Sequence, residues 1–408
     1  MEAALNRPTV VPDGPVRVIA AGKAAVPMAA AAHRIFGTRI RQGLIVGVGA
    51  AGDIVTGSIP FEMIVGGHPM PTAESERGGR RALEIAASLQ PDETLLVLLS
   101  GGASALMAVP ADGITLADKQ ATTRHLLRGG ANIHELNTVR KHLSAIKGGW
   151  LAAMAPGPCR TFAMSDVVGD DLSVIGSGPT VPDATTFRDA LDILRRFTGD
   201  GGDNAYPPAV IKRVVSGARG DVPETPKPAD STLSQASTTV IGGRRQAMDG
   251  AAGEAASRGY HVIRIDDAVV GEARVAALSH LRMALARAAD VPRPACIISS
   301  GETTVRVTGD GLGGRNQEFA LACASALASL GVPAAAASIG TDGVDGPTDA
   351  AGAIADSTTL ARATAAGLKP ESFFERNDTY RLFETLGDLI HTGPTGTNVG
   401  DIQAILLA

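Results

Sequence analysis

Residues 95–107 read LLVLLSGGASALM, and this stretch decides the fold class of the chain. Five consecutive aliphatic residues predict a buried strand, which runs straight into the turn Ser100-Gly101-Gly102. Small, helix-favouring residues follow the turn. A buried strand, a tight glycine turn and a helix in direct succession are typical of a parallel sheet that is covered by helices.

The same succession recurs along the rest of the chain. It predicts a strand over 16–20 with a helix over 24–36, and a helix over 103–107 after the strand just described. Further strands are expected at 43–48, 63–65, 161–164, 239–241, 261–265, 295–299, 305–307, 335–339 and 402–407. This alternation predicts an α/β fold with parallel sheets, in which ligands bind where strands end and glycine turns begin.

Length and composition set the outer limits. A chain of 408 residues is long enough for two or three domains. The segment 216–232 contains three prolines among small and charged residues, so we expect one domain over 1–228 and a second over 229–408. The formal net charge of −5 excludes a nucleic-acid binder held by bulk positive charge. The 49 glycines indicate heavy use of glycine turns.

The sequence favours a soluble cytoplasmic protein. Its three cysteines lack metal-ligand and CxxC spacing, and we expect buried thiols at Cys159, Cys296 and Cys323. Residues 1–15 lack the apolar core of a signal peptide. The uncharged stretch 94–111 is interrupted by its glycine turn, so it predicts a strand and a helix rather than a membrane span. Neither nucleic acid nor a membrane is therefore expected as a partner.

Two glycine turns at strand ends carry residues that suit an anion. Lys23 follows Gly22 in the first turn of a helix, where free amides and the helix dipole favour a phosphate or a carboxylate. The turn 100–104 exposes amides in the same geometry, beside Ser100 and Ser104. A solvated surface lysine and a ligand-free turn are the alternatives, and the lysine turn lacks the spacing of a Walker A loop.

A helix predicted over 137–151 has two faces at helical spacing. The apolar face, expected to be buried, consists of Val139, Leu143, Ile146 and Trp150. The polar face consists of Asn137, Arg140, Ser144 and Lys147. This polar face could grip an anionic substrate, with Arg140 as a fork-shaped donor, or it could be an ordinary solvated face.

Acidic residues gather in two loops that follow strands. Asp166 and Asp170 lie among glycines and hydroxyls, and their density suggests a magnesium site or a general base. Asp342 and Asp345 lie in the glycine loop 340–349. That loop is not an EF-hand, because the ligand at the twelfth position and the preceding helix are missing. Acidic turns without any ligand are the alternative.

Two further turns precede a helix and a strand. Four glycines in the turn 309–314 let a backbone approach a phosphate closely, and Arg315 can neutralise transferring oxygens at the entrance of a helix predicted over 319–330. The turn 392–398 offers amides and hydroxyls without charge. Plain turns without a ligand are the alternative in both cases.

Together the motifs resemble those of the class II glycerate kinases, also called the MOFRL family, some of whose members carry the older label hydroxypyruvate reductase. The matching segments run in order from residue 20 to residue 403: AAGKAAVPMA, GHPMPTAESERGG, LSGGASAL, ELNTVRKHLSAIKGG, SDVVGDDLSVIGSGPT, GETTVRVTGDGLGGRNQEFAL, GTDGVDGPTDAAGA and TGPTGTNVGDIQ. The resemblance implies a larger N-terminal Rossmann-like domain, with helices on both faces of a parallel sheet. It also implies a smaller C-terminal α/β domain, with the active site in the cleft between the two.

The activity that the resemblance implies is transfer of the γ-phosphoryl group of ATP, with Mg²⁺, to the 2-hydroxyl of D-glycerate, giving 2-phosphoglycerate and ADP. Lys23 and Arg315 match family positions considered catalytic, and we expect them to clamp the transferring phosphoryl group. Asp166 is expected to accept the hydroxyl proton. Magnesium ligands are expected at Asp170, Asp342 and Asp345.

Arg140 and Lys147 are the residues expected to bind the glycerate carboxylate. The whole set expected to bind substrate or phosphate is His68, Ser100, Gly101, Gly102, Ser104, Asn137, Arg140, Lys147, Gly178, Glu302, Gly313, Gly314, Asn316, Thr395 and Asn398. The protein is expected to act as a monomer or a homodimer.

Two other functions compete with the kinase. The formula G-x-G-x-x-G occurs at 47–52 and at 309–314, which suits an NAD(P)H-dependent hydroxypyruvate reductase. The first occurrence leaves no room for the required helix, because a glycine and a proline follow within 53–60. After the second, three aspartates stand where a ribose site needs one acidic residue. A sensor that only binds a sugar acid would not need cationic and acidic loops in both halves.

Overall fold

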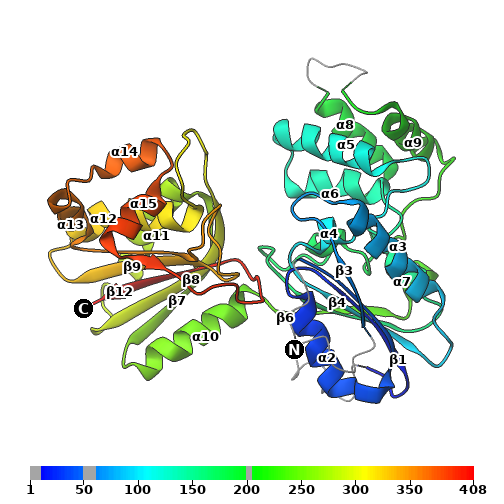
Figure 1. The fold of residues 1–408 in the computed structure, drawn as a ribbon, viewed down its shortest axis with the longest axis horizontal. Helices are drawn as coiled ribbons and strands as arrows, with labels where there is room; N and C mark the ends of the chain where they lie inside the picture. Colours follow the sequence, from blue (N-terminus) through cyan, green and yellow to red (C-terminus); the bar gives the residue numbers. More distant parts are fainter. Residues whose placement is uncertain (1–10, 49–60, 199–204) are drawn as a thin grey trace. The chain divides into compact units, whose positions relative to one another are not determined.

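The computed structural model describes residues 11–48, 61–198 and 205–408, which form two compact units (Figure 1). The first unit contains the described residues up to Ser165 together with 170–241. The second contains 166–169 and 242–408. Each unit has its own six-stranded sheet, so the α/β fold predicted from the sequence is confirmed.

The first unit combines a sheet with helices on both of its faces and a separate group of helices. Its strands are β1 (Val16–Ala21), β2 (Ile40–Gly47), β3 (Phe61–Val65), β4 (Thr94–Leu99), β5 (Cys159–Met164) and β6 (Ala236–Gly242). Its helices are α2 (Ala25–Phe36), η1 (Gly37–Arg39), α3 (Ala73–Ala87), α4 (Ala103–Leu106), α5 (Leu116–Arg128), α6 (Ile133–His142), α7 (Trp150–Ala153), η2 (Ile175–Ser177), α8 (Phe187–Arg196), α9 (Pro208–Arg219) and η4 (Ser231–Leu233).

The first sheet has the strand order β3-β2-β1-β4-β5-β6, and β1 pairs in parallel with both β2 and β4. Alternate side chains of β1 point to opposite faces, and Val18 and Ala20 join the core beneath α2. Helix α3 covers the other face, where Gly78 lies against Val46. The order 3-2-1-4-5-6 is that of the doubly wound dinucleotide-binding fold, whose ligand crevice opens between strands 1 and 4.

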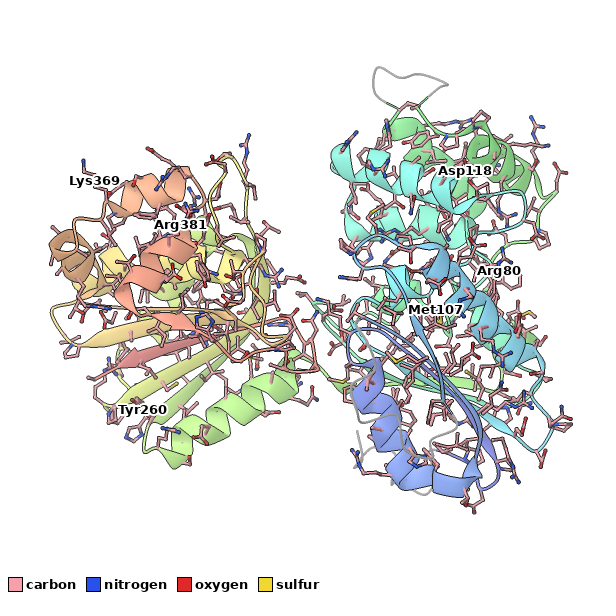
Figure 2. The ribbon with its side chains drawn as sticks, in the orientation of Figure 1. Arg80, Met107, Asp118, Tyr260, Lys369 and Arg381 are labelled. Carbon is pink, nitrogen blue, oxygen red and sulfur yellow. The ribbon has the colours of Figure 1, made fainter. Side chains whose placement is uncertain are left out.

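Helices α5, α6, α8 and α9 pack on one another around Leu126, Phe187 and Val214. Figure 1 shows them gathered apart from the sheet of the first unit. Helix α5 begins with a capping box, in which Thr115 Oγ1 accepts from the amide of Asp118 at 3.1 Å and the Asp118 carboxylate accepts from the amide of Thr115 at 2.9 Å. Asp118 is labelled in Figure 2.

The second unit is built around a mixed sheet of order β11-β10-β9-β12-β8-β7. Its strands are β7 (His261–Glu272), β8 (Ala295–Thr304), β9 (Ala334–Gly340), β10 (Gly352–Asp356), β11 (Leu389–Ile390) and β12 (Asp401–Leu407). Its helices are α10 (Arg244–Ser257), α11 (Ala273–Arg287), α12 (Arg315–Ala328), α13 (Thr359–Ala365), α14 (Pro370–Glu375) and α15 (Thr379–Leu386). Helix α10 covers one face of the sheet and α11 and α12 cover the other (Figure 1).

Parallel pairing was expected in both sheets, and for the second sheet that prediction is wrong. Among the described strands of this sheet, β7 and β8 pair in parallel, while β12 runs antiparallel to both β8 and β9 and β10 runs antiparallel to β9 and β11. Strands β9 and β10 are joined by residues 341–351 without a helix, and so short a connection returns the chain in the antiparallel direction. Strands β10 and β11 were not predicted.

The prediction of a single helix over 137–151 is confirmed for residues 137–142 and 150–151 and is wrong for the residues between them. Helix α6 ends at His142, and α7 starts only at Trp150. Between them the amide of Ala145 and the hydroxyl of Ser144 both donate to the Val109 carbonyl, at 3.1 and 3.0 Å, so the chain follows a neighbouring segment instead of a helix. Gly148 and Gly149 then adopt φ angles of 60° and 90°, which a helix does not contain. Residues 305–307, predicted as a strand, form none, because β8 ends at Thr304.

Several other expectations concern the whole chain. Cys159, Cys296 and Cys323 are buried free thiols, as predicted. Among the described residues, none of the helices combines the length and the apolar character that crossing a membrane requires. The residues 49–60, on which the argument against the first dinucleotide pattern rests, lie outside the described residues, as do residues 1–10.

The chain passes into the second unit between Ile241 and Gly242, at the end of β6. Strand β6 belongs to the first sheet. The boundary between 228 and 229 stays a prediction about which parts of the chain fold independently, and the position of β6 makes it testable.

Candidate functional site

The turns after β1 and β4 meet at the crevice that the strand order defines. The amide of Lys23 donates to the Gly101 carbonyl at 2.8 Å, and the amide of Ala24 donates to the Ser100 hydroxyl at 2.9 Å. Gly22, which has a φ of 126°, lies so close to Ser100 that a Cβ atom there would overlap the serine side chain. The two turns predicted to bind an anion are therefore one structure.

His68 joins this structure from the segment after β3. A Cβ atom on Gly102 would lie 3.0 Å from Cδ2 of His68 and 3.6 Å from Cγ of Lys23. Three of the residues predicted as site residues thus converge from the carboxyl ends of β1, β3 and β4. Parallel strands place their carboxyl ends at one edge of a sheet, which is why residues so distant in sequence meet here.

A chain of polar contacts leads from the glycine turn into the protein. Lys147 Nζ donates to the Ser104 carbonyl at 2.7 Å and to its hydroxyl at 2.9 Å. The hydroxyls of Ser104 and Ser177 are hydrogen bonded at 2.8 Å, and Ser177 Oγ donates to Oδ1 of Asn137 at 3.0 Å. Gly178 ends the short η2 helix directly after Ser177. The structure thereby brings together Ser104, Lys147, Asn137 and Gly178, all predicted, with Ser177, which sequence reasoning missed.

The polar residues of 137–147 do not form a solvated face. Asn137 is 3% exposed and Lys147 is 2% exposed, while Arg140 is half-buried. Burial lowers the pKa of Lys147 well below its usual range, and the charges of Lys119 and Arg140 lower it further. Burial also lowers the pKa of Arg140 to about 10. Cations that are desolvated in this way are typical of sites that bind an anion.

Lys119 on α5 belongs to the same group of charges and was not predicted. It is 6% exposed, and its Nζ donates to the Val109 carbonyl at 3.3 Å. Burial lowers the pKa of Lys119 to about 7, with a further contribution from Arg140. Nothing in the local sequence distinguishes Lys119 from a surface lysine of α5, because its burial depends on how α5 and α6 pack.

Part of the acidic loop after β5 belongs to the second unit. The structure groups 166–169 with the second unit, where Nδ2 of Asn398 donates to Oδ2 of Asp166 at 3.1 Å. Asp170 belongs to the first unit and adopts a φ of 53°. The predicted residues Asp166 and Asn398 are therefore in direct contact, whereas Asp170 and Asp342 lie in different units.

Arg315, at the start of α12, already has a carboxylate partner. Its Nε and Nη2 atoms donate to the two oxygens of Asp401 at 2.7 and 2.9 Å, and its Nη1 lies 3.3 Å from Oε1 of Glu302. Burial alone would lower the pKa of Arg315, but the hydrogen bonds and charge of Asp401 outweigh burial and raise it. Asp401 is buried and holds the guanidinium in one orientation.

Asp345 caps α12 from the loop after β9. Its carboxylate accepts from the amides of Asn316 and Gln317 at 3.0 and 2.9 Å and from Nδ2 of Asn316 at 3.2 Å. Burial raises the pKa of Asp345 to about 6, against the opposing effect of these amide hydrogen bonds. The free amides that a helix offers to a phosphate are thus occupied by a carboxylate of the protein itself.

The glycine turn 309–314 packs on the segment before α15. Oδ1 of Asn377 accepts from the amide of Gly309 at 3.0 Å, the Arg376 carbonyl accepts from the amide of Gly311 at 2.8 Å, and Asp378 accepts from the amide of Leu312 at 2.9 Å. These glycines bring one backbone close to another. The amides of Asp310, Gly313 and Gly314 donate to no atom of the described residues.

The loops that contain Asp342 and Thr395 contact each other. The amide of Thr395 donates to the Asp342 carbonyl at 3.3 Å, and its hydroxyl donates to the Thr341 carbonyl at 2.6 Å. Within the described part of the chain, no group of three or more His, Cys, Asp or Glu side chains could hold a metal ion. The Asp345 oxygens accept three hydrogen bonds as the cap of α12, and Oδ1 of Asp342 accepts from the amide of Val344 at 3.2 Å.

Comparison with known proteins finds two family matches, in different parts of the chain. Residues 2–214 match a family described as a domain of unknown function, DUF4147, and residues 295–401 match the MOFRL family. The chain is similar to the D-glycerate 2-kinase of Thermotoga maritima, with 39% identity over 95% of this chain and 89% of that protein. It is equally similar, at 39% identity over 99% of this chain and 90% of that protein, to a protein of Agrobacterium vitis named "Putative hydroxypyruvate reductase". The crystal structure of glycerate kinase from Thermotoga maritima superposes with a TM-score of 0.84 at 38% identity, covering 97% of this chain and 92% of that chain.

Proposed function

The chain belongs to the glycerate kinase family that carries a MOFRL domain, and from this premise we propose that it transfers the γ-phosphoryl group of ATP to the 2-hydroxyl of D-glycerate. The products are 2-phosphoglycerate and ADP. The observation that carries the proposal for the site is the convergence of Lys23, His68 and Gly102 at the crevice between β1 and β4. This crevice combines a flexible cation, glycine amides and a helix start, which together suit phosphate oxygens.

Phosphoryl transfer needs positioning and charge neutralisation more than covalent help from the protein. Lys23 would hold the transferring group at the glycine turn, and Arg140 with Lys147 would hold the carboxylate of glycerate. Asp166 would accept the proton of the 2-hydroxyl as its oxygen attacks the phosphorus and ADP leaves. The hydrogen bond from Asn398 would orient the Asp166 carboxylate for this step.

Arg315 would act from the second unit as an oriented cation. Two of its donors are held by Asp401, which leaves Nη1, beside Glu302, to meet a phosphate oxygen. Magnesium usually binds through one or two carboxylates together with substrate phosphates, so Asp170 and Asp342 would suffice to hold it with ATP, where it would neutralise phosphate charge. Asp345 would keep its place as the cap of α12.

The geometry favours the kinase over the reductase. A dinucleotide site places its pyrophosphate on the amides at the start of the helix after the glycine formula. At the turn 309–314 the helix amides are bonded to the Asp345 carboxylate, and the turn amides of Gly311 and Leu312 are bonded to residues 376 and 378. A pyrophosphate there would meet a carboxylate instead of free donors.

The test of this function is a product assay with purified protein, ATP, Mg²⁺ and D-glycerate, with the product identified by nuclear magnetic resonance. We expect 2-phosphoglycerate. Formation of no phosphoglycerate, combined with oxidation of NADH on hydroxypyruvate, would establish the reductase instead.

The roles of the two cations are tested by Lys23→Ala and Arg315→Ala. Each should lower kcat by about 100- to 1,000-fold, the loss seen when one preorganised donor to a developing charge is removed. Lys212→Ala serves as the matched control, because Lys212 is an exposed lysine of α9. Wild-type turnover in either site variant, with the fold intact by circular dichroism, would refute the clamp.

A further inference from the structure

We propose that Lys119 is the third cation of a buried carboxylate-binding site, which it forms with Arg140 and Lys147. The proposal rests on the proposed function, because it takes the ligand to be the carboxylate of the three-carbon acid substrate. Lys119 comes from α5 and Arg140 from α6, while Lys147 comes from the segment that precedes α7. Figure 2 labels Asp118, the residue that precedes Lys119 at the start of α5.

Lys119, Arg140 and Lys147 are not balanced by a carboxylate in direct contact. The hydrogen bonds of Lys119 and Lys147 run to carbonyl and hydroxyl oxygens, and no carboxylate of the described residues lies within ion-pair distance of either lysine or of Arg140. Two buried lysines and a half-buried arginine therefore share one region, and the carboxylate of Glu76 acts on Lys119 only from beyond ion-pair distance. Desolvated like charges destabilise a fold, and a bound anion removes that penalty.

The ammonium group of Lys119 has unsatisfied hydrogen-bond donors. An ammonium group has three donors, and among the described residues Lys119 has one acceptor, the Val109 carbonyl at 3.3 Å. That carbonyl also accepts from Ser144 and from the amide of Ala145, so the contact with Lys119 is a shared and long one. A carboxylate would supply the acceptors that the buried ammonium lacks.

The polar groups around these cations indicate which kind of anion fits. Beside the cations lie the linked hydroxyls of Ser104 and Ser177 and the amide of Asn137. A small hydroxy acid suits this arrangement, because its carboxylate can pair with the cations and its hydroxyls can hydrogen bond to the neighbouring hydroxyl and amide groups. Lys23 at the glycine turn is more exposed than Lys119 and Lys147, so the turn offers the more open position for a triphosphate and the buried cations suit a ligand that can be fully desolvated.

The experiment compares Lys119→Met with wild type by thermal unfolding, without ligand, with D-glycerate alone and with ATP alone. Because methionine removes the charge and keeps an apolar stem, we expect the ligand-free variant to melt at a higher temperature than wild type. The shift that D-glycerate causes should be lost and the shift that ATP causes should remain. In the kinase assay KM for glycerate should rise roughly 10- to 100-fold, the loss expected for one charged hydrogen bond.

Two variants make the result specific. Lys119→Arg keeps the charge and should retain most of the response to D-glycerate, even if Lys119→Met fails to fold. Lys212→Met, on the exposed face of α9, should match wild type in every measurement. A ligand-free Lys119→Met that melts below wild type and keeps the wild-type KM would make Lys119 a structural lysine and overturn the proposal. The proposal would also be overturned if Lys119→Met lost the thermal shift caused by ATP and kept the shift caused by D-glycerate.

Proton uptake on binding of D-glycerate distinguishes a ligand-binding role of Lys119 from a purely structural one. The groups that act on Lys119 are Arg140 of α6, Lys147, Arg213 of α9 and, with opposite sign, Glu76 of α3. An anion bound near pH 7 would favour the charged form of Lys119, so binding of D-glycerate should take up a proton. Calorimetry in two buffers of different ionisation enthalpy should detect this uptake in wild type and not in Lys119→Met.

Failure of the proposed function can be told apart from failure of this site. Both the thermal and the calorimetric arms use D-glycerate without ATP and need no turnover. A wild type that binds D-glycerate through Lys119 and forms no phosphoglycerate would overturn the kinase and support the site. If the wild type forms phosphoglycerate, binds D-glycerate without proton uptake and is unaffected by Lys119→Met, the kinase function is supported and the Lys119 site is overturned.

Discussion

At the scale of single residues, the two units treat their charges differently. In the second unit the charged site residues have protein partners: Arg315 is bonded to Asp401, and the Asp345 carboxylate to the start of α12. In the first unit Lys119 and Lys147 are buried without a carboxylate of the described residues beside them. Paired groups are preorganised, whereas the cations of the first unit gain most from a ligand.

Asp345 should make the stability of the protein depend on pH. Its pKa is raised from 3.8 to about 6 by burial, so between these values the folded state binds a proton that the unfolded state does not. The free energy of unfolding contributed by this group is therefore highest below pH 3.8 and falls as the pH rises to about 6. Asp345→Asn, which does not titrate, should lack this fall in urea unfolding curves measured between pH 4 and 7.

The control for this measurement is Asp310→Asn, which alters an exposed aspartate of the neighbouring glycine turn. It should follow the wild-type pH profile. Parallel profiles for wild type and Asp345→Asn would show that Asp345 titrates as an ordinary aspartate.

The site residues were predictable to the extent that they follow strands. Lys23, His68 and Gly102 each come directly after a predicted strand, and the carboxyl ends of parallel strands meet. Lys119 and Ser177 follow no such rule, because their places depend on helix packing and on a loop. The glycine turn 309–314 was correctly located, but its contacts with residues 376–378 are long-range and have no local signal.

At the scale of secondary-structure elements, glycine inside a helix has two different meanings in this chain. In α9, Gly217 lies against the ring of Phe187 in α8, and a Cβ atom there would overlap that ring. In α10, a Cβ atom on Gly250 would meet nothing within 4 Å. The first glycine is needed for the close approach of two helices, and the second is not.

Replacing these two glycines by alanine should therefore change stability in opposite directions. Gly250→Ala should stabilise the second unit by about 0.5–1 kcal/mol, the usual gain in helix propensity. Gly217→Ala should destabilise the first unit by roughly 1–3 kcal/mol, because overlap with Phe187 outweighs that gain. Urea unfolding of both variants checks this, and a stabilising Gly217→Ala would mean that α8 and α9 can move apart at little cost.

The errors in the predicted elements share one physical cause. Apolar spacing over 137–151 matched a helix, yet the hydrogen bonds to Val109 and the φ angles of Gly148 and Gly149 break it. The strand directions of the second sheet were also missed. Runs of apolar residues locate strands well, but the direction in which a strand pairs is set by connections elsewhere in the chain.

At the scale of the whole molecule, the two units have separate hydrophobic cores. The second unit has a complete six-stranded sheet and its own core around Phe319 and Phe383, all from residues after 242. The first unit includes β6, which ends at the boundary. The boundary predicted after residue 228 lies before β6, whose residues 236–242 join the sheet of the first unit.

Fragments should distinguish the two divisions. We expect residues 242–408 to fold alone, with α/β circular dichroism and a single cooperative urea transition. Fragment 229–408 should gain no stability over it, because β6 would have no sheet of its own to join. A fragment 229–408 that unfolds at clearly higher urea than 242–408 would favour the boundary at 228.

The burial of the three cysteines gives each unit a reporter of its own. Cys159 lies in β5, whereas Cys296 and Cys323 lie in β8 and α12. Burial raises their pKa values to about 12, 11 and 12, so the reactive thiolate hardly exists in the native state. Alkylation must then wait until the surrounding structure opens. The labelling rate of Cys159 would time the opening of one sheet and that of Cys296 the opening of the other, in the unmodified chain and in a single sample.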